Sequence, residues 1–177
     1  MTARKFALVV AADEDFGIGK DGGLPWKLPG EMAHFKRVTT NAPEGQQNAV
    51  LMGRKTFESI APKFRPLRGR LNVVLSRAPG FTVDDALAAP SLPGALALLA
   101  DRSDVARIFV IGGGELYRQA LAHPACEEVV FTRVHGHFDC DTKLPDFRAQ
   151  FSLAAQDGPH EENGTRYTFE RWRVSGA

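Results

Sequence analysis

The chain has 177 residues, of which 44% are hydrophobic and 24% are charged, a length and composition typical of one folded domain. Its 22 basic and 21 acidic residues nearly cancel, which argues against the broad positive field of a nucleic-acid or membrane-surface binder. We therefore expect a single domain over residues 1–177 with no nucleic-acid or membrane partner, and any anion must be recognised by local clusters of charge.

The first fifteen residues, MTARKFALVVAADED, have the outline of a secretory signal, since two basic residues precede seven apolar ones. That run is at the minimum length for a signal and ends in three acids, so we predict a buried first strand instead. No stretch approaches the ~20 apolar residues of a membrane span. The two cysteines, Cys126 and Cys140, give no disulfide framework and suit a reducing compartment, so we expect a cytoplasmic protein.

Short β-branched runs alternate with helix-like stretches along the chain, which predicts an α/β fold. The expected strands are KFALVVAA (5–12), NAVLM (48–52), RLNVVLS (70–76), RIFVIG (107–112), EEVVFTRV (127–134) and RYTFERWRV (166–174). The earlier runs are continuously apolar, as in a mostly parallel sheet buried on both faces, whereas the last alternates like an antiparallel edge strand. Helices are expected at 31–40, 54–60, 93–100 and 114–122, the third as a plain surface helix.

Three strand ends carry groups that suit an anion, and ligands of doubly wound sheets bind at the carboxyl ends of strands. The groups are Gly53-Arg54-Lys55-Thr56, Ser76-Arg77 and Gly112-Gly113-Gly114 followed by Glu115 and Leu116. In the first, two cations open a helix whose dipole disfavours them unless an anion binds. In the second, a guanidinium stands where an NAD site usually has an acid, which indicates a 2′-phosphate. In the third, bare backbone amides can approach a pyrophosphate.

Each of these three signals is by itself more often structural, a tight turn or a solvated loop charge. Because they occur at three strand ends of one predicted sheet, together they favour a phosphorylated dinucleotide as the ligand.

Glu31 opens a helix directly after the Gly/Pro-framed loop GGLPWKLP. At roughly 100° per residue, the apolar residues Met32, Phe35 and Val38 share its side of the helix, whereas His34 falls outside. An acid in a first turn often only balances the helix dipole, but such an acid has no reason to face apolar neighbours. A carboxylate among apolar side chains is costly to desolvate unless a ligand offers donors or a raised pKa is used, so Glu31 marks a candidate site.

Five motifs, taken in order, make nearly the whole chain resemble dihydrofolate reductase: GIGKDGGLPWKLPGE, LMGRKTFESI, RPLRGRLNVVLSR, VIGGGELY and FDCDTKLPDF. The resemblance implies a mostly parallel, doubly wound eight-stranded sheet with an antiparallel C-terminal edge strand and helices on both faces. It also implies NADPH-dependent reduction of 7,8-dihydrofolate to 5,6,7,8-tetrahydrofolate for one-carbon metabolism, with hydride reaching pterin C6 and a proton reaching N5. We expect a monomer that binds antifolate inhibitors at the same site.

By the resemblance, Glu31 is the active-site acid that accepts hydrogen bonds from the pterin, and Thr132 supports its carboxylate. Leu24 and Trp26 belong to a loop that closes over the nicotinamide, with Trp26 holding a water near the pterin. By the same resemblance, Arg70 binds the glutamate α-carboxylate of the substrate, for which a planar guanidinium with two parallel N–H donors is suited. The other implied substrate-binding residues are Val9, Val10, Met32, Phe35, Ile60, Leu67, Ile111 and Tyr117.

The implied cofactor-binding residues lie on the first strand, the following loop and the three strand ends. They are Ala11, Ile18, Gly19, Gly53, Arg54, Lys55, Thr56, Ser76, Arg77, Gly112, Gly113, Gly114, Glu115 and Leu116. The family also has a cis peptide bond that corresponds to Gly112–Gly113. The acid at position 31 is Glu rather than Asp, and two segments are long, TTNAPEGQQNAVLM and SIAPKFRPLRGR. Both features resemble eukaryotic members of the family, and together they predict weak binding of trimethoprim-like inhibitors.

Three alternatives bear on this interpretation. The segment HGHFDCD suggests a metal site, because His135 and His137 share a strand face and Cys140 follows, but no distant ligand set completes it and we expect no metal. A related fold serves NADPH-dependent pyrimidine reductases of flavin biosynthesis, which would not need Glu31, Arg70 and the LPW loop together. A non-catalytic NADPH-binding module would bind cofactor without turnover.

Overall fold

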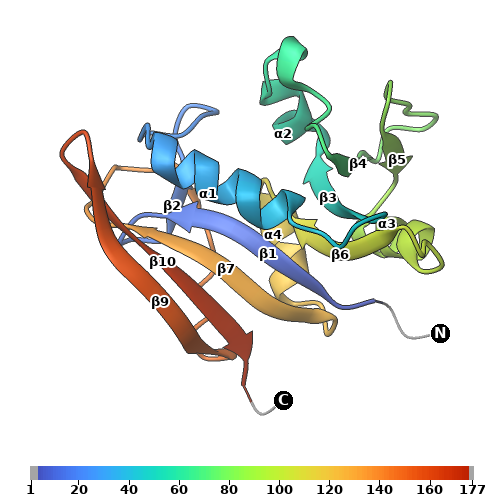
Figure 1. The fold of residues 1–177 in the computed structure, drawn as a ribbon. Helices are drawn as coiled ribbons and strands as arrows, with labels where there is room; N and C mark the ends of the chain where they lie inside the picture. The colour runs from blue at the N-terminus through green and yellow to red at the C-terminus, as the bar shows by residue number, and fades with distance from the viewer. Residues whose placement is uncertain (1–3, 176–177) are drawn as a thin grey trace.

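The computed structural model describes residues 4–175 of the chain (Figure 1). The strands in this part of the chain are β1 (Phe6–Ala12), β2 (Gly17–Gly19), β3 (Gln47–Gly53), β4 (Arg70–Leu75), β5 (Leu87–Ala89), β6 (Val105–Val110), β7 (Cys126–Val134), β8 (Thr142–Lys143), β9 (Phe151–Glu162) and β10 (Thr165–Val174). The helices are α1 (Pro29–Thr40), α2 (Arg54–Ser59), α3 (Leu92–Leu99) and α4 (Gly114–Leu121), with a 3-10 turn at Pro62–Phe64.

Eight of the strands form one sheet in the order β5-β4-β3-β6-β1-β7-β10-β9, while β2 and β8 pair separately. The first six strands of that order are parallel to one another, and β10 is antiparallel to both β7 and β9. β1 lies in the middle, with Phe6 to Val10 all buried, which explains its continuously apolar sequence. The expected α/β class and eight-stranded, mostly parallel sheet are confirmed.

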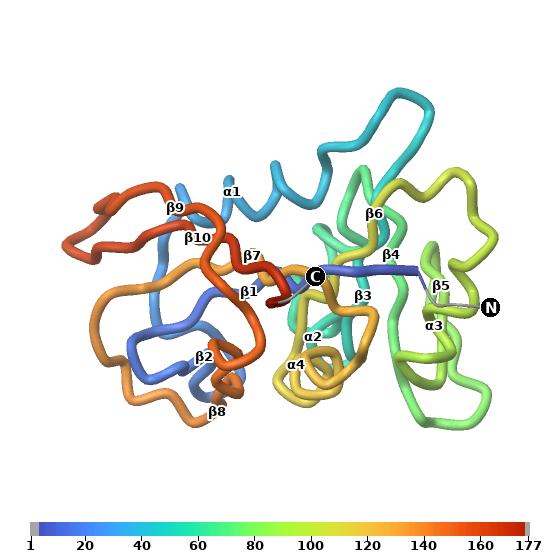
Figure 2. Tube along the Cα trace, turned by 90° about the horizontal axis from the view of Figure 1, so that it is seen from below, coloured from blue at the N-terminus to red at the C-terminus, as the bar shows by residue number. Residues whose placement is uncertain are grey.

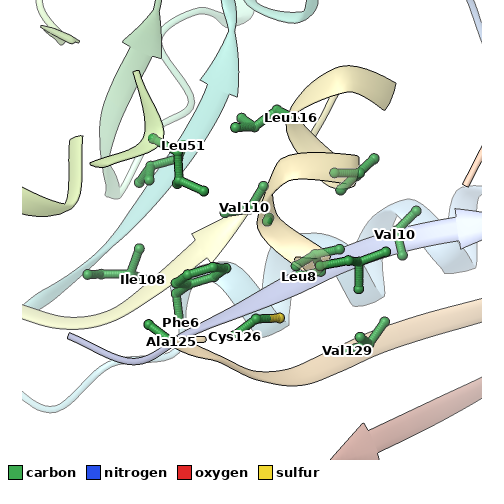
Figure 3. Packing of buried hydrophobic residues seen from close by; sticks show 14 of the residues in the cluster. Phe6, Leu8, Val10, Leu51, Ile108, Val110, Leu116, Ala125, Cys126 and Val129 are labelled. Atoms are coloured by element: carbon green, nitrogen blue, oxygen red, sulfur yellow. The ribbon is translucent and has the colours of Figure 1, made fainter. Parts of the chain in front are cut away.

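The side chains of the sheet alternate between two cores. On one face, Leu8, Val10 and Val110 pack with residues of α3 and α4, as Figure 3 shows in part. On the other face, Ala7 and Val9 belong to a second cluster that includes Phe57 of α2 and is joined by half-buried residues of α1. Figure 2 shows α1 and α4 on opposite sides of the sheet, so the expected helices on both faces are confirmed.

The expectation of a C-terminal edge strand needs one correction. β10 is antiparallel as predicted, but β9 pairs along its outer side and forms the edge. The sequence FSLAAQDGPHEE of β9 did not suggest a strand because only Phe151 is buried and Pro159 interrupts the run. Both features suit an exposed edge, where proline costs no ladder hydrogen bond.

Smaller differences concern short or half-buried elements. The strands β2, β5 and β8 have two or three residues each and were missed because so short a run carries no periodicity. Helix α3 is more than a surface helix, since Leu92, Ala95, Leu96 and Leu99 are buried in the core. Its first turn is capped by the Ser91 hydroxyl, which accepts from the Gly94 N–H at 3.1 Å.

Among residues 4–175, no helix has the length and apolar character needed to cross a membrane. Cys126 and Cys140 are both buried and free.

Candidate active site

The three anion-suited strand ends meet at one edge of the sheet, because β3, β4 and β6 run parallel. The Gly53 N–H donates to the Gly112 carbonyl at 2.9 Å, which joins the first and third of them. A side chain on Gly113 would place its Cβ 3.2 Å from the Thr56 hydroxyl, so the two turns are in close contact. Ser76-Arg77 follows β4, next to β3. The geometry therefore brings together residues, such as Gly53 and Gly112, that lie far apart in the sequence.

Glu31 lies in the first turn of α1 and is 9% exposed, so the predicted burial of this acid is confirmed. Its Oε1 accepts a hydrogen bond from the Thr132 hydroxyl of β7 at 3.3 Å. Burial raises the pKa of Glu31, and the hydrogen bond from Thr132 opposes that rise only partly. Among the described residues no cation forms an ion pair with Glu31. The carboxylate is therefore poised for a ligand that brings its own donors.

The buried face of α1 is rotated slightly from the expected one. Phe35 and Val38 pack against the core as predicted, but Met32 is 62% exposed. His34, expected outside the buried arc, instead stacks on Phe169 of β10 with ring centroids 3.8 Å apart. Met32 lies at one margin of the predicted arc, about 100° from Glu31. The contact between His34 and Phe169 lies on the other side of Glu31, so the buried face of α1 is rotated toward His34 and away from Met32.

Tyr117 of α4 fills the space beneath the glycine turn. Its hydroxyl donates to the Val9 carbonyl at 2.7 Å, and burial together with the charge of Glu31 raises its pKa. Gly112 has a φ of 114°, and a side chain there would place its Cβ 3.0 Å from the Tyr117 ring, so glycine is required on both counts. The peptide bond between Gly112 and Gly113 is cis, as the resemblance implied.

The expected apolar substrate contacts separate into two sets. Phe35, Ile60, Leu67 and Ile111 are half-buried and pack on the cluster that contains Val9. Val10, however, points to the other face and belongs to the core with Leu116 and Tyr117. Alternation along a strand makes this unavoidable for consecutive residues, so the side chain of Val10 does not share the face of Glu31.

Arg70 begins β4 and is half-buried beside α1. Its Nη1 donates to the Thr39 hydroxyl at 2.9 Å and its Nε to the Arg68 carbonyl at 2.9 Å. Burial lowers the pKa of Arg70, and no acidic side chain within residues 4–175 forms an ion pair with it. A half-buried guanidinium without a carboxylate is suited to an acidic ligand.

The loop between β1 and α1 brings its predicted residues to different depths. Trp26 is buried, and its Nε1 has no acceptor in the described part of the chain, whereas Leu24 is 56% exposed. Ile18 approaches the third strand end, since a side chain on Gly114 would place its Cβ 3.7 Å from Ile18 Cδ1. Gly19 pairs with Thr142 of β8, and its carbonyl accepts from the N–H of Asp141, the residue before that strand, at 2.9 Å.

The charged groups at the strand ends remain accessible. Arg54 pairs with Glu58 at 3.0 Å and lies 4.8 Å from the Phe81 ring centre, so its charge is partly balanced within α2. Lys55 and Arg77 are exposed, and Glu115 pairs with Arg118 along α4. Two further residues were predicted to bind the cofactor, Ala11 of β1 and Leu116 of α4. Leu116 is buried in the core cluster of Leu8 and Val10, and Ala11 is partly buried against the cluster that contains Trp26.

Two buried polar residues that hold this site together were not predicted. The Asp13 carboxylate accepts from the N–H groups of Asp15 and Gly17 at 2.9 and 2.8 Å and from that of Phe138 at 3.0 Å, which fixes the start of the loop. Burial alone would raise the pKa of Asp13, but these donors and the charge of Lys143 bring it below its ordinary value. The side-chain amide of Asn72 accepts from the Leu67 N–H at 2.8 Å and donates to the Leu67 carbonyl at 2.9 Å, which fixes the backbone at Leu67.

The HGHFDCD segment was the alternative metal site. His135 lies 3.4 Å from Glu14, and His137 lies 2.7 Å from Asp15, so each histidine pairs with one acid of the neighbouring loop. Within residues 4–175 no group of three or more His, Cys, Asp or Glu side chains is arranged to hold a metal ion.

Comparisons with known proteins give one consistent family. Residues 5–174 match the family model described as dihydrofolate reductase. A bifunctional dihydrofolate reductase-thymidylate synthase of Glycine max is 43% identical over 178 residues, which cover 94% of this chain and 33% of that protein. The dihydrofolate reductase of Drosophila melanogaster is 37% identical, with 94% of this chain and 96% of the relative covered.

The solved structures include a similar fold. Schistosoma mansoni dihydrofolate reductase matches 98% of this chain and 100% of its own with a TM-score of 0.84 and 37% identity. The chain thus spans about a third of the length of the bifunctional relatives and nearly the whole of the fly and schistosome proteins.

Proposed function

The chain belongs to the dihydrofolate reductase family, and from this premise we propose that it reduces 7,8-dihydrofolate to tetrahydrofolate with NADPH. The observation that carries the proposal is the buried carboxylate of Glu31, which has a hydrogen bond from Thr132 and no cationic partner among the described residues. Such a group needs a ligand with paired N–H donors, and the 2-amino group and ring N–H of a pterin provide them.

The rest of the substrate would follow α1 toward β4. The pterin and benzoyl rings would pack on Phe35, Ile60 and Leu67, which share one half-buried apolar cluster. The glutamate α-carboxylate would reach Arg70, whose guanidinium already has a fixed orientation through Thr39. A carboxylate anchor at one end and a guanidinium anchor at the other suit a substrate with complementary groups at its two ends.

The residues present also fit a phosphorylated nicotinamide cofactor. The Gly112-Gly113-Gly114 turn at the N-terminus of α4 offers backbone N–H groups to a pyrophosphate, and Arg54, Ser76 and Arg77 offer charge and a hydroxyl to a 2′-phosphate. When bound, NADPH would supply the hydride that the pterin C6 needs. Ala11 near the end of β1 and Ile18, which approaches Gly114, would border the nicotinamide together with Gly19.

The protein's own part in the reaction is to orient the pterin, exclude water and admit one proton to N5. Glu31 would bind the 2-amino edge, which is remote from N5, so the proton reaches N5 through water or after an enol shift of the pterin. Trp26 supports the water route, since its buried Nε1 lacks a protein acceptor among the described residues and can hold an ordered water. Leu24, exposed in the same loop, would close over the cofactor.

We also infer one catalytic domain that works as a monomer in the cytoplasm. One eight-stranded sheet extends from β1 near the start of the described residues to β10 at their end, and the two buried free cysteines suit a reducing compartment. Antifolates would compete at the Glu31 site because they present similar donors.

The proposal is tested by following the loss of NADPH absorbance with the purified chain. We expect turnover with dihydrofolate and none with the pyrimidine substrate of flavin biosynthesis. The reverse pattern would identify a pyrimidine reductase, and NADPH binding without turnover on either substrate would identify a non-catalytic module.

A further inference from the structure

The β9–β10 hairpin ends beside the first turn of α1 (Figures 1 and 2). Its turn is Asn163-Gly164, with φ values of 50° and 78°, which is the sequence and conformation of a two-residue type I′ turn. The turn fixes the register so that Glu162 pairs with Thr165, and Tyr167 with His160. Cross-strand partners share a face of the sheet, and so do residues two positions apart on one strand. Glu162 therefore lies on the same face as Thr165 and Tyr167, which is the face that α1 covers.

Glu162 Oε1 accepts two hydrogen bonds at the start of α1. One comes from the Gly30 N–H at 2.8 Å and the other from the Tyr167 hydroxyl at 2.8 Å. A side chain on Gly30 would place its Cβ 2.6 Å from the Tyr167 hydroxyl and 2.8 Å from Glu162 Oε1. The absence of a side chain at position 30 is therefore what admits this contact.

The helix has no cap of its own. The N-cap residue, Leu28, has an apolar side chain, and Pro29 has no N–H group to be satisfied. Gly30 thus carries the first free N–H of the helix, and Glu162 supplies the acceptor that a local Ser, Thr, Asp or Asn usually supplies. Glu162 has no Lys, Arg or His partner in the described part of the chain, so the positive end of the α1 dipole is its counter-charge.

The acceptor is itself held rigidly. Tyr167 is 4% exposed and packs with Trp26 and Leu28 in one buried cluster. One turn further along α1, His34 stacks on Phe169 of the same strand. The hairpin therefore contacts α1 at two points, and the residue between them that faces the pterin site is Glu31.

We propose that Glu162 is a positioning residue for the reduction, a cap supplied from the β9–β10 hairpin that fixes the first turn of α1 and with it the carboxylate of Glu31. This inference rests on the proposed function of Glu31. It predicts that an exposed hairpin 131 residues away in sequence controls how productively dihydrofolate binds, without touching substrate or cofactor.

The experiment compares the full chain with its variants Glu162→Ala, Glu162→Gln and Glu161→Ala, using NADPH and dihydrofolate. Glu161→Ala is the matched control, because Glu161 is the exposed neighbour on the same strand. We expect Glu162→Ala to lower kcat/KM for dihydrofolate roughly tenfold, because small misplacements of a binding group are costly to rate. The Kd of NADPH should stay within about twofold, and Glu162→Gln, which keeps an acceptor oxygen, should recover most of the loss.

Gly30→Ala gives an independent variant, since its Cβ occupies the space of the Glu162 contact. It should resemble Glu162→Ala, and adding Glu162→Ala to it should cause little further loss. Hydrogen exchange of the amides at the start of α1 should be faster in both variants than in the wild type.

A lowered Tm with unchanged kcat/KM in Glu162→Ala, while the wild type turns over, would overturn the positioning role. Failure of the wild type to reduce dihydrofolate would instead overturn the proposed function, and unchanged exchange at Gly30 in Glu162→Ala would overturn the cap by itself.

Discussion

Thr132 of β7 donates a hydrogen bond to Oε1 of Glu31 at 3.3 Å, which joins the sheet to the first turn of α1 across the buried edge of the site. This single neutral donor does not compensate the desolvation of a carboxylate, and the pKa of Glu31 stays raised. The protein thus retains a buried acid that costs stability and that a bound pterin would satisfy.

Replacing Glu31 by Gln should therefore stabilise the ligand-free protein at neutral pH. A carboxyl whose pKa is higher in the folded than in the unfolded chain contributes stability below its unfolded pKa, about 4.3, and loses it as pH rises through the folded value. Urea unfolding of the wild type and Glu31→Gln should show an advantage for Gln at neutral pH that shrinks as the pH falls through the raised pKa of Glu31 and has ended by about pH 4. An advantage independent of pH would mean that the charge is not its cause.

Arg77→Ala should weaken NADPH binding and leave NADH nearly unaffected, because Arg77 is an exposed cation at the end of β4 with no ion pair among the described residues. A charge-assisted bond to a phosphate contributes roughly 1.5–3 kcal/mol, or about ten- to hundredfold in Kd. Fluorescence titration with both cofactors measures the change, with the exposed Arg166→Ala as control. Equal efficiency of the wild type with NADH and NADPH would contradict the assignment.

Inhibitor selectivity should depend on the length of the acid at position 31. A diaminopyrimidine presents a protonated ring nitrogen and an amino group to the carboxylate, so one extra C–C bond shifts how deeply its side ring enters beside Phe35, Ile60 and Leu67. Methotrexate-like compounds that also reach Arg70 should bind tightly, whereas trimethoprim-like compounds lack that anchor and should bind weakly.

Inhibition constants for both compound types, on the wild type and Glu31→Asp, test this expectation. Nanomolar trimethoprim binding by the wild type would refute it. An unchanged ratio in Glu31→Asp would assign selectivity to the long segments before β3 and β4 instead.

Glu128 should matter for stability and not for turnover. Its side chain is 3% exposed and lies 3.3 to 3.4 Å from Arg107, Arg171 and Arg173, which are themselves 40% to 67% exposed. Glu128→Gln leaves three cations without a buried partner, but water reaches them, so we expect a loss of about 1–2 kcal/mol. Urea unfolding measures it, with the exposed Glu127→Gln as control. If Glu128→Gln loses no more stability than Glu127→Gln, the ion pairs of Glu128 with the three arginines do not stabilise the fold.

The sequence alone predicted the elements that have strong periodicity or continuous burial. Strands β1, β3, β4, β6, β7 and β10 and all four helices were predicted to within about two residues. β9 was missed because an edge strand that buries only Phe151 has no hydrophobic pattern to detect. Glu31 was identified from its place on the helix, and its burial is confirmed.

What could not be predicted are contacts between distant segments. Nothing in the sequence indicates that His34 stacks on Phe169, because that contact depends on how α1 packs against β10. Alternation along β1 does require Val9 and Val10 to face opposite sides of the sheet, but it does not say which of them faces the site. Asp13 and Asn72 carried a weak signal, a polar residue at the end of or within an apolar run, but not the identity of the backbone groups they hold. The roles of the site residues remain predictions.

The central claim, that this chain reduces dihydrofolate at the Glu31 carboxylate, is tested most directly by single-turnover hydride transfer from NADPH in the wild type and Glu31→Gln. We expect rapid transfer in the wild type and, in Glu31→Gln, unchanged NADPH affinity with most of the rate lost at neutral pH. Part of that rate should return at low pH, where dihydrofolate is protonated from solvent. Near wild-type transfer by Glu31→Gln at neutral pH would contradict the account and place the chemistry elsewhere.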